Sequence, residues 1–303
     1  MTDHGAATSV VIDIRGVQKD FGNTRALDGL NLRVEQGQIH GFLGPNGAGK
    51  TTTLRLMLGL LSRDGGHATL LGQDPWTNAV ELHRRLSYVP GEVSLWPSLS
   101  GGECIDYLLR LRGGADRSRV TNLQQQFDLD PRMKVSSYSK GNRQKVALIA
   151  ALAVDVELYI FDEPTDGLDP LMAEVFREQV NALGALGRTV LLSSHVLAEV
   201  DAVCDYVTII RDGQTIESGA LAELRHLQRQ SLTIETQTEL ADISGISGVH
   251  DVERMGRVVR CTVEPHALNE VLKHASTAKV INLETRPPSL EEMFLRYYDR
   301  ESS

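Results

Sequence analysis

The chain has 303 residues, enough for one large domain and a second, smaller one. Its formal net charge of −9 at pH 7 argues against a broad nucleic-acid-binding surface, which normally carries a basic excess. No nucleic acid partner is therefore expected. The cysteines Cys104, Cys204 and Cys261 are far apart and form no CxxC pair, which favours reduced thiols over a disulfide or a metal site.

No segment of the sequence is expected to cross a membrane. The longest uninterrupted apolar run, Val146–Val154, falls well short of the roughly 20 residues that a membrane-spanning helix needs. The N-terminal residues lack the basic segment followed by an apolar segment that marks a signal peptide. We therefore expect a cytoplasmic protein that reaches the inner face of the cell membrane only through a partner.

Strands alternate with helices over the first two thirds of the chain. In chain order, we expect strands at 10–14, 30–34 and 39–43, a helix at 51–61, a polar segment interrupted by glycine at 62–74, a mostly helical span at 79–135 with loops at 90–100 and 113–118, a strand at 158–161, a helix at 171–186, and strands at 189–192, 206–210 and 214–217. This order predicts an α/β fold with a largely parallel sheet and an antiparallel portion near the start.

The pattern of predicted elements changes beyond about residue 225. Short strands are expected at 231–236, 248–253, 258–263 and 279–285, and helices at 266–275 and 289–298. We predict a first domain at 10–224, with a helical subdomain at about 79–155, and a small α+β domain at 225–303.

Residues Gly44–Thr51 match the phosphate-binding pattern G-x4-G-K-[ST]. They lie between a predicted buried strand and a helix, a context that disfavours a plain glycine turn. The glycines let backbone N–H groups surround phosphates, Lys50 reaches the β- and γ-phosphates, and the Thr51 hydroxyl can bind Mg²⁺. The predicted nucleotide-binding residues of this segment are Gly44, Pro45, Asn46, Gly47, Ala48, Gly49, Lys50, Thr51 and Thr52.

Two adjacent carboxylates follow the apolar strand at 158–161. Asp162 is expected to hold Mg²⁺, and Glu163 to act as the base or polarising group for the attacking water. An Asp-Glu pair after a strand is more often the start of a solvated loop, but the phosphate-binding segment upstream favours the catalytic interpretation.

Four motifs together resemble those of the ATP-binding-cassette (ABC) ATPases, in order and in spacing. They are Gly44–Thr51, Tyr138–Asn142, Phe161–Asp169 and Ser194–His195, and the resemblance covers about residues 10–218. It implies the P-loop NTPase fold of an ABC ATPase, with ATP and Mg²⁺ as cofactors. It also implies that Glu163 is the catalytic glutamate and that His195 contacts the γ-phosphate.

The same resemblance implies roles for two further residues. Phe21 occupies the place of an aromatic side chain that stacks on adenine, although by itself it is better interpreted as a core aromatic residue. Asp169 belongs to the family's D-loop, and we count it among the nucleotide-binding residues.

The segment Tyr138–Asn142 stands where the family has its LSGGQ signature. Ser139 is expected to cap the helix that follows, and Ser139 and Gly141 to face phosphate. In the family this element binds the nucleotide of the opposite subunit, so one phosphate-binding segment and one signature imply a homodimer or a pseudo-symmetric pair of cassettes. Lys140 and Asn142 depart from the family pattern.

A second departure follows the strand near residue 89. Where the family has a glutamine that senses Mg²⁺ and the membrane partner, this chain has Gly91 and then Glu92. We expect Glu92 to take the glutamine's place near the metal, the alternative being an ordinary loop carboxylate.

The signature, the Gly91-Glu92 variant and Pro288–Phe294 resemble the drug-resistance branch of bacterial exporters, of the daunorubicin/doxorubicin type. This implies a peripheral ATPase subunit that drives drug efflux through integral membrane permease subunits. The alternatives are an importer ATPase and a soluble ABC ATPase that acts on the ribosome or DNA. The single cassette and the acidic composition disfavour the last.

Overall fold

The computed structural model describes residues 9–226 and 229–286. Their contacts divide the chain into two compact units, one ending at Ser218 and the other beginning at Gly219. The division falls within strand β9 (Gln214–Ala220), earlier than the boundary after residue 224 that the sequence suggests. Helix α8 (Leu221–His226) therefore belongs to the second unit.

A six-stranded sheet of order β5-β6-β7-β3-β8-β9 is the centre of the first unit. The pairs β5–β6, β6–β7, β7–β3 and β3–β8 are parallel, which confirms the predicted architecture. Every residue of β3, β6 and β7 is buried, as expected for parallel strands that are covered on both faces. The strands of this sheet other than β9 are β3 (Ile39–Leu43), β5 (Leu86–Val89), β6 (Leu158–Asp162), β7 (Thr189–Ser194) and β8 (Tyr206–Arg211).

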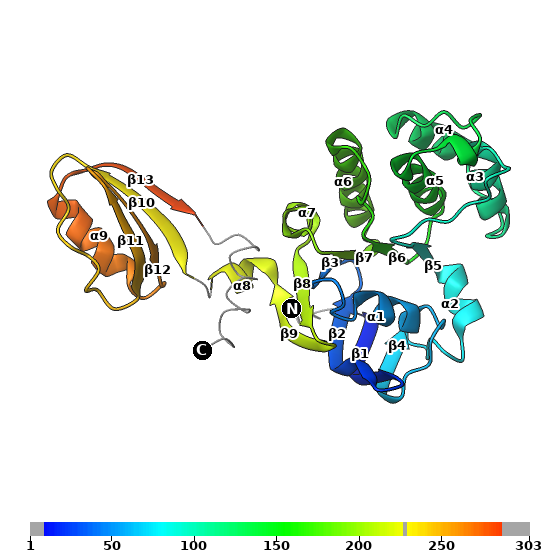
Figure 1. The fold of residues 1–303 in the computed structure, drawn as a ribbon, viewed down its shortest axis with the longest axis horizontal. Helices are drawn as coiled ribbons and strands as arrows, with labels where there is room; N and C mark the ends of the chain where they lie inside the picture. Colours follow the sequence, from blue (N-terminus) through cyan, green and yellow to red (C-terminus); the bar gives the residue numbers. More distant parts are fainter. Residues whose placement is uncertain (1–8, 227–228, 287–303) are drawn as a thin grey trace, which may run out of the picture. The chain divides into compact units, whose positions relative to one another are not determined.

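A separate antiparallel sheet has the order β2-β1-β4. Its strands are β1 (Val10–Phe21), β2 (Thr24–Glu35) and β4 (Gly65–Leu70). Apolar side chains of this sheet share one core with helix α1 (Lys50–Met57) and with Phe42, Ile160 and Leu191 of the main sheet. The two sheets and α1 therefore form one body (Figure 1).

Two strands have no counterpart in the sequence prediction. In β4 only Ala68 and Leu70 are buried, too few to produce a clear alternation of apolar and polar residues. Strand β5 lies in the span 79–135, which the sequence predicts to be mostly helical. The prediction is wrong for the four residues of β5, because they pair with β6. An apolar run this short does not distinguish strand from helix by its periodicity.

Six helices of the first unit follow α1. They are α2 (Ala79–Arg85), α3 (Gly101–Arg110), α4 (Arg117–Gln126), α5 (Lys140–Leu152), α6 (Pro170–Ala185) and α7 (Leu197–Val203). Helices α3, α4 and α5 gather beyond the β5–β6 edge of the sheet (Figure 1). The predicted helical subdomain at about 79–155 is therefore too wide, because β5 belongs to the main sheet. In the described part of the chain, no helix combines the length and apolar character needed to cross a bilayer.

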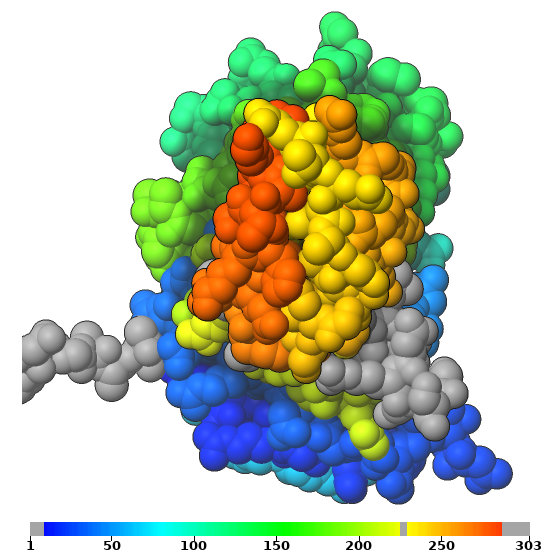
Figure 2. Space-filling view, turned by 90° about the vertical axis from the view of Figure 1, so that its left-hand side faces the viewer, coloured from blue at the N-terminus to red at the C-terminus, as the bar shows by residue number. Residues whose placement is uncertain are grey.

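The second unit is a four-stranded antiparallel sheet of order β11-β12-β10-β13 with helix α9 (Leu268–Thr277). Its strands are β10 (Gln230–Thr236), β11 (Val249–Met255), β12 (Val258–Val263) and β13 (Val280–Arg286). Leu232, Val259 and Val271 belong to its separate apolar core. All four strands and α9 confirm the predicted α+β appendage, and β13 is exposed along its whole length at the surface seen in Figure 2. The predicted helix at 289–298 lies outside the described residues.

One buried side chain of the first unit makes its stability depend on pH. His40 lies on β3, is only 2% exposed, and has Nε2 2.8 Å from the Thr208 hydroxyl. Its Nδ1 is buried without a hydrogen-bond partner, and burial lowers the pKa of His40 from 6.5 to about 3. The folded protein thus keeps His40 neutral at pH values where the unfolded chain takes up a proton.

We predict that this difference lowers stability in mild acid. The stabilising contribution of neutral His40 is complete above pH 6.5 and falls by about 1.4 kcal/mol per pH unit as the pH drops from 6.5 towards 3. Urea unfolding of the wild type and His40→Gln at pH 7, 6 and 5 measures this loss. As the pH drops, the free energy of unfolding of the variant is expected to fall less steeply than that of the wild type, because the variant takes up about one proton fewer on unfolding. Parallel pH profiles of the two proteins would show that another group is responsible.

Candidate functional site

Three neighbouring parallel strands end together at one edge of the main sheet. Leu43 at the end of β3 pairs with Ser194, and Asp162 at the end of β6 pairs with Ser193. The segments that follow these strands carry the predicted phosphate loop, the predicted carboxylates and His195. The strand order β6-β7-β3 therefore places the three motifs side by side, at the carboxyl end where open α/β sheets bind ligands.

The glycine loop before α1 depends on glycine at two turns. Gly47 and Gly49 have φ angles of 84° and 107°, a region that other residues rarely adopt. A Cβ atom on Gly49 would also lie 2.8 Å from a Leu27 methyl carbon and 3.0 Å from the Ala26 carbonyl oxygen. Because these two glycines have no side chains, the backbone N–H groups before α1 are accessible. This is the geometry in which N–H groups at the start of a helix bind phosphate.

The Lys50 side chain lies inside this loop and is almost fully buried. Its Nζ donates to the Gly44 carbonyl at 2.5 Å and to the Pro45 carbonyl at 3.3 Å. The same Nζ lies 3.5 Å from Oε1 of Glu163. The lysine Nζ thus lies between the loop and Glu163, the first residue after β6.

Asp162 is a buried carboxylate surrounded by hydroxyl groups. Ser193 on β7 donates a short hydrogen bond to its Oδ1, and the Thr51 hydroxyl lies 3.5 Å from its Oδ2. Burial raises the pKa of Asp162, and the adjacent Glu163 charge adds to the rise. A cation beside Asp162 would offset this cost, and oxygen donors of this kind suit Mg²⁺, which one or two carboxylates hold together with substrate phosphates.

Glu163 is held from several sides. Its Oε2 lies 2.7 Å from Nδ1 of His195 and accepts the His195 backbone N–H at 3.3 Å. Its own backbone N–H donates to the Ser193 carbonyl at 3.0 Å. The φ angle of Glu163 is 47°, in the left-handed region that glutamate seldom occupies. The structure therefore brings the two predicted catalytic residues together in a constrained geometry.

A cavity of about 540 Å³ opens over these groups, within the size range of small-molecule sites. Glu92 also lines this cavity, and Gly91 beside it lies against Asp162. The sequence-predicted residues that line the cavity are Pro45, Asn46, Gly47, Gly49, Lys50, Thr51, Thr52, Glu92, Asp162 and Glu163.

Other predicted residues do not line this cavity. Gly44 and Ala48 are buried within the glycine loop itself. Phe21 is 48% exposed at the end of β1, with Nζ of Lys19 5.7 Å from its ring centre. Asp169 caps α6 by accepting the Met172 N–H at 3.0 Å.

The signature turn at the start of α5 is attached to the loop that follows β6. Ser139 accepts the Asn142 N–H at 3.2 Å, which confirms its predicted role as a helix cap. Lys140 contacts Asp166 with Nζ 2.5 Å from Oδ2, and buried Gln144 donates to the Pro164 carbonyl at 3.0 Å. The loop that carries Glu163 therefore also supports the signature turn.

Several residues at the site have no assigned role in the sequence analysis. Ser193 contacts Asp162 because β7 lies next to β6, and only the strand order reveals this neighbour. Gln144 contacts the Glu163 loop from α5, although it is distant from that loop in the sequence. Thr165, Ser194 and Glu199 form a further contact beside Glu163 and His195.

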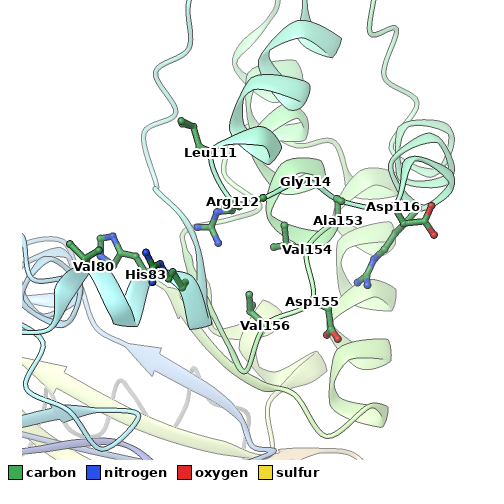
Figure 3. A pocket seen from close by; sticks show the side chains of 14 residues that line it. Val80, His83, Leu111, Arg112, Gly114, Asp116, Ala153, Val154, Asp155 and Val156 are labelled. Carbon is green, nitrogen blue, oxygen red and sulfur yellow. The ribbon is translucent and has the colours of Figure 1, made fainter.

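A larger cavity, of about 1050 Å³, lies apart from the glycine loop (Figure 3). Val80, His83 and Arg84 of α2 form one side. The α3–α4 connection at 111–116 with Arg119 of α4, and the α5–β6 connection at 153–156, form the others. Its lining contains both apolar and charged side chains.

Comparisons with known proteins identify the families that the two parts of the chain resemble. Residues 27–166 match the family described as ABC transporter, and residues 219–298 match the family described as ATP-binding protein DrrA1-3-like, C-terminal domain. The Nod factor export ATP-binding protein I of Cupriavidus pinatubonensis is 34% identical over 97% of this chain and 93% of its own length. The daunorubicin resistance ATP-binding protein DrrA3 of Streptomyces coeruleorubidus is 33% identical over 96% of each chain. A solved ATP binding subunit of an ABC transporter is 28% identical, with a TM-score of 0.67 over 71% of this chain and 92% of its own.

The contact between the signature turn and the Glu163 loop leaves no room for a side chain at Gly141. A Cβ atom there would lie 2.4 Å from the Gly167 carbonyl oxygen. We predict that Gly141→Ala lowers the free energy of unfolding by about 1–3 kcal/mol, because one of the two segments must move. Gly245→Ala is the matched control, since Gly245 has open space around its Cα, and it is expected to change stability by less than about 0.5 kcal/mol. Equal stability of the two variants in urea would contradict the prediction.

Proposed function

The chain belongs to the ATP-binding, ATP-hydrolysing subunits of ABC transporters, and we propose that it powers the export of drugs or other xenobiotics through separate membrane subunits. The observation that carries the proposal is the single cavity that joins the glycine loop and Lys50 to Asp162 and Glu163. The export assignment is supported by the relatives named for daunorubicin resistance and Nod factor export, which match nearly the whole chain. We place the protein at the cytoplasmic face of the membrane, bound to those subunits.

The chemistry follows from the side chains around the cavity. The phosphates of ATP would lie in the glycine loop, where Lys50 would exchange its carbonyl contacts for β- and γ-phosphate oxygens. Thr51 and Asp162 would hold Mg²⁺, which neutralises phosphate charge when bound. Glu92 is proposed as a further contact on the metal side, because it lines the same cavity.

Glu163 is placed to activate water. In the proposed reaction, water oxygen bonds to the γ-phosphorus as the bond to the β–γ bridging oxygen breaks, and the water proton passes to the Glu163 carboxylate. His195 contacts that carboxylate through Nδ1 and through its backbone N–H, and so orients it. The products are ADP and inorganic phosphate.

We propose that two cassettes close on ATP, either as a homodimer or as a pseudo-symmetric pair. Ser139 and Gly141, at the start of α5, are proposed to face the partner's nucleotide, and Asp169 is proposed as a further nucleotide contact. Phe21 is exposed on its own strand, as an adenine-stacking side chain requires.

The test of the hydrolytic site is Glu163→Gln. The amide keeps the size of the side chain but cannot take a proton, so we predict normal ATP binding, a stable ATP-dependent dimer by size-exclusion chromatography, and at least about a hundredfold slower hydrolysis. Lys50→Ala serves as the comparison and is expected to lose ATP binding itself. Brisk turnover by Glu163→Gln would overturn the proposal.

The larger cavity is proposed to receive a segment of the membrane subunit. Val80 and Leu111 at this cavity are 75% and 68% exposed. The charged side chains of the lining include three arginines, Arg84, Arg112 and Arg119, and two aspartates, Asp116 and Asp155. A surface with exposed apolar side chains and an excess of arginine fits an amphipathic helix with acidic residues. On the α2 side of the cavity, the chain continues through β5 to Glu92. On another side, residues 153–156 come directly after α5, the helix that begins at the signature turn.

A charge introduced at this cavity is expected to uncouple the ATPase from its membrane partner. We predict that Leu111→Glu abolishes the stimulation of ATPase by the co-reconstituted membrane subunit and leaves basal ATPase within about twofold, because Leu111 does not line the cavity over the glycine loop. The matched control is Leu186→Glu, since Leu186 is also 68% exposed but does not line the cavity. Full stimulation of the Leu111 variant would exclude this docking surface.

A further inference from the structure

Glu199, in the first turn of α7, joins the two loops that carry the proposed catalytic pair. Its Oε1 accepts a hydrogen bond from the Thr165 hydroxyl at 2.5 Å. Its Oε2 accepts one from the Ser194 hydroxyl at 3.1 Å. Thr165 lies on the loop after β6, and Ser194 is the last residue of β7.

These two contacts complete a ring of interactions around the active site. Thr165 is two residues after Glu163, and Ser194 is directly before His195. On the other side of the ring, Glu163 and His195 contact each other at 2.7 Å. The spacing of the two loops is thus set at one end by the catalytic pair and at the other by the Glu199 carboxylate.

The Glu163 backbone has a conformation that surrounding contacts must hold. Its φ of 47° is unfavourable for glutamate, and such a conformation persists only where the surrounding structure holds it. Hydrogen bonds to an ionised carboxylate are roughly twice as strong as neutral ones, so Glu199 is a firm anchor for Thr165. Ser194 is itself fully buried and its hydroxyl also accepts the Val196 N–H at 2.9 Å, which fixes the other half of the anchor.

We infer that Glu199 is a positioning residue for ATP hydrolysis. It holds the loop after β6 against the loop after β7, so that the Glu163 carboxylate stays within reach of His195. The inference rests on the proposed function, since it assumes that this pair acts on ATP.

Glu199→Ala and Glu199→Gln in the full-length protein test this role. We expect the alanine variant to lose at least about tenfold in kcat with KM for ATP changed less than about twofold, because a small misplacement of a reacting group alters chemistry more than binding. The glutamine variant is expected to recover most of kcat, since its amide can accept from Thr165 and donate to Ser194. Glu178→Ala, on the exposed face of α6, is the control for loss of a surface carboxylate.

A second substitution keeps the test decisive if Glu199→Ala folds poorly. Thr165→Val removes the same hydrogen bond from the other side and is expected to show the same loss of kcat. The double variant should then lose no more kcat than either single variant, as for residues that act through one contact.

Unchanged kcat in Thr165→Val and Glu199→Ala would overturn the inference while leaving the proposed function intact. A loss of ATP binding parallel to kcat, without rescue by glutamine, would also overturn it. Failure of the proposed function itself would appear separately, as normal hydrolysis by Glu163→Gln.

Discussion

The parallel pairing of β6, β7 and β3 is the constraint on which the active site depends. Because Asp162 is level with Ser193, and Ser194 with Leu43, the three strands deliver their following loops to one edge of the sheet. All three strands are buried throughout, so their register cannot shift without exposing apolar surface. The burial that stabilises the sheet therefore also fixes the distances between the glycine loop, the carboxylates and His195.

The loop after β6 has two structural tasks at once. On one side Glu163 contacts Lys50 and His195, and on the other Asp166 and Pro164 support the start of α5. Ion pairs as exposed as Lys140–Asp166 contribute little stability, so this contact can be broken at low cost. In the proposed dimer, the segment that hydrolyses one nucleotide thus also supports the turn facing the other.

Local chemical patterns explain what the sequence predicts well. The glycine loop, the Asp-Glu pair and the Ser139 cap each depend on a few consecutive residues, and the structure places each as the pattern suggests. The prediction is poor where partners are distant. Strand β5 is too short to show a period, and the contacts of Ser193 and Glu199 depend on which strand lies beside β6. Such neighbours arise only after the chain has folded.

The most direct test of the proposed site is a crystal structure of Glu163→Gln with Mg²⁺ and ATP. We expect phosphates within the glycine loop, Lys50 on the β- and γ-phosphates, and the metal bound by Thr51 and Asp162. We also expect the substituted side chain at position 163 to face the γ-phosphate. Phosphates bound away from Lys50, or a metal held by residues outside this cavity, would contradict it.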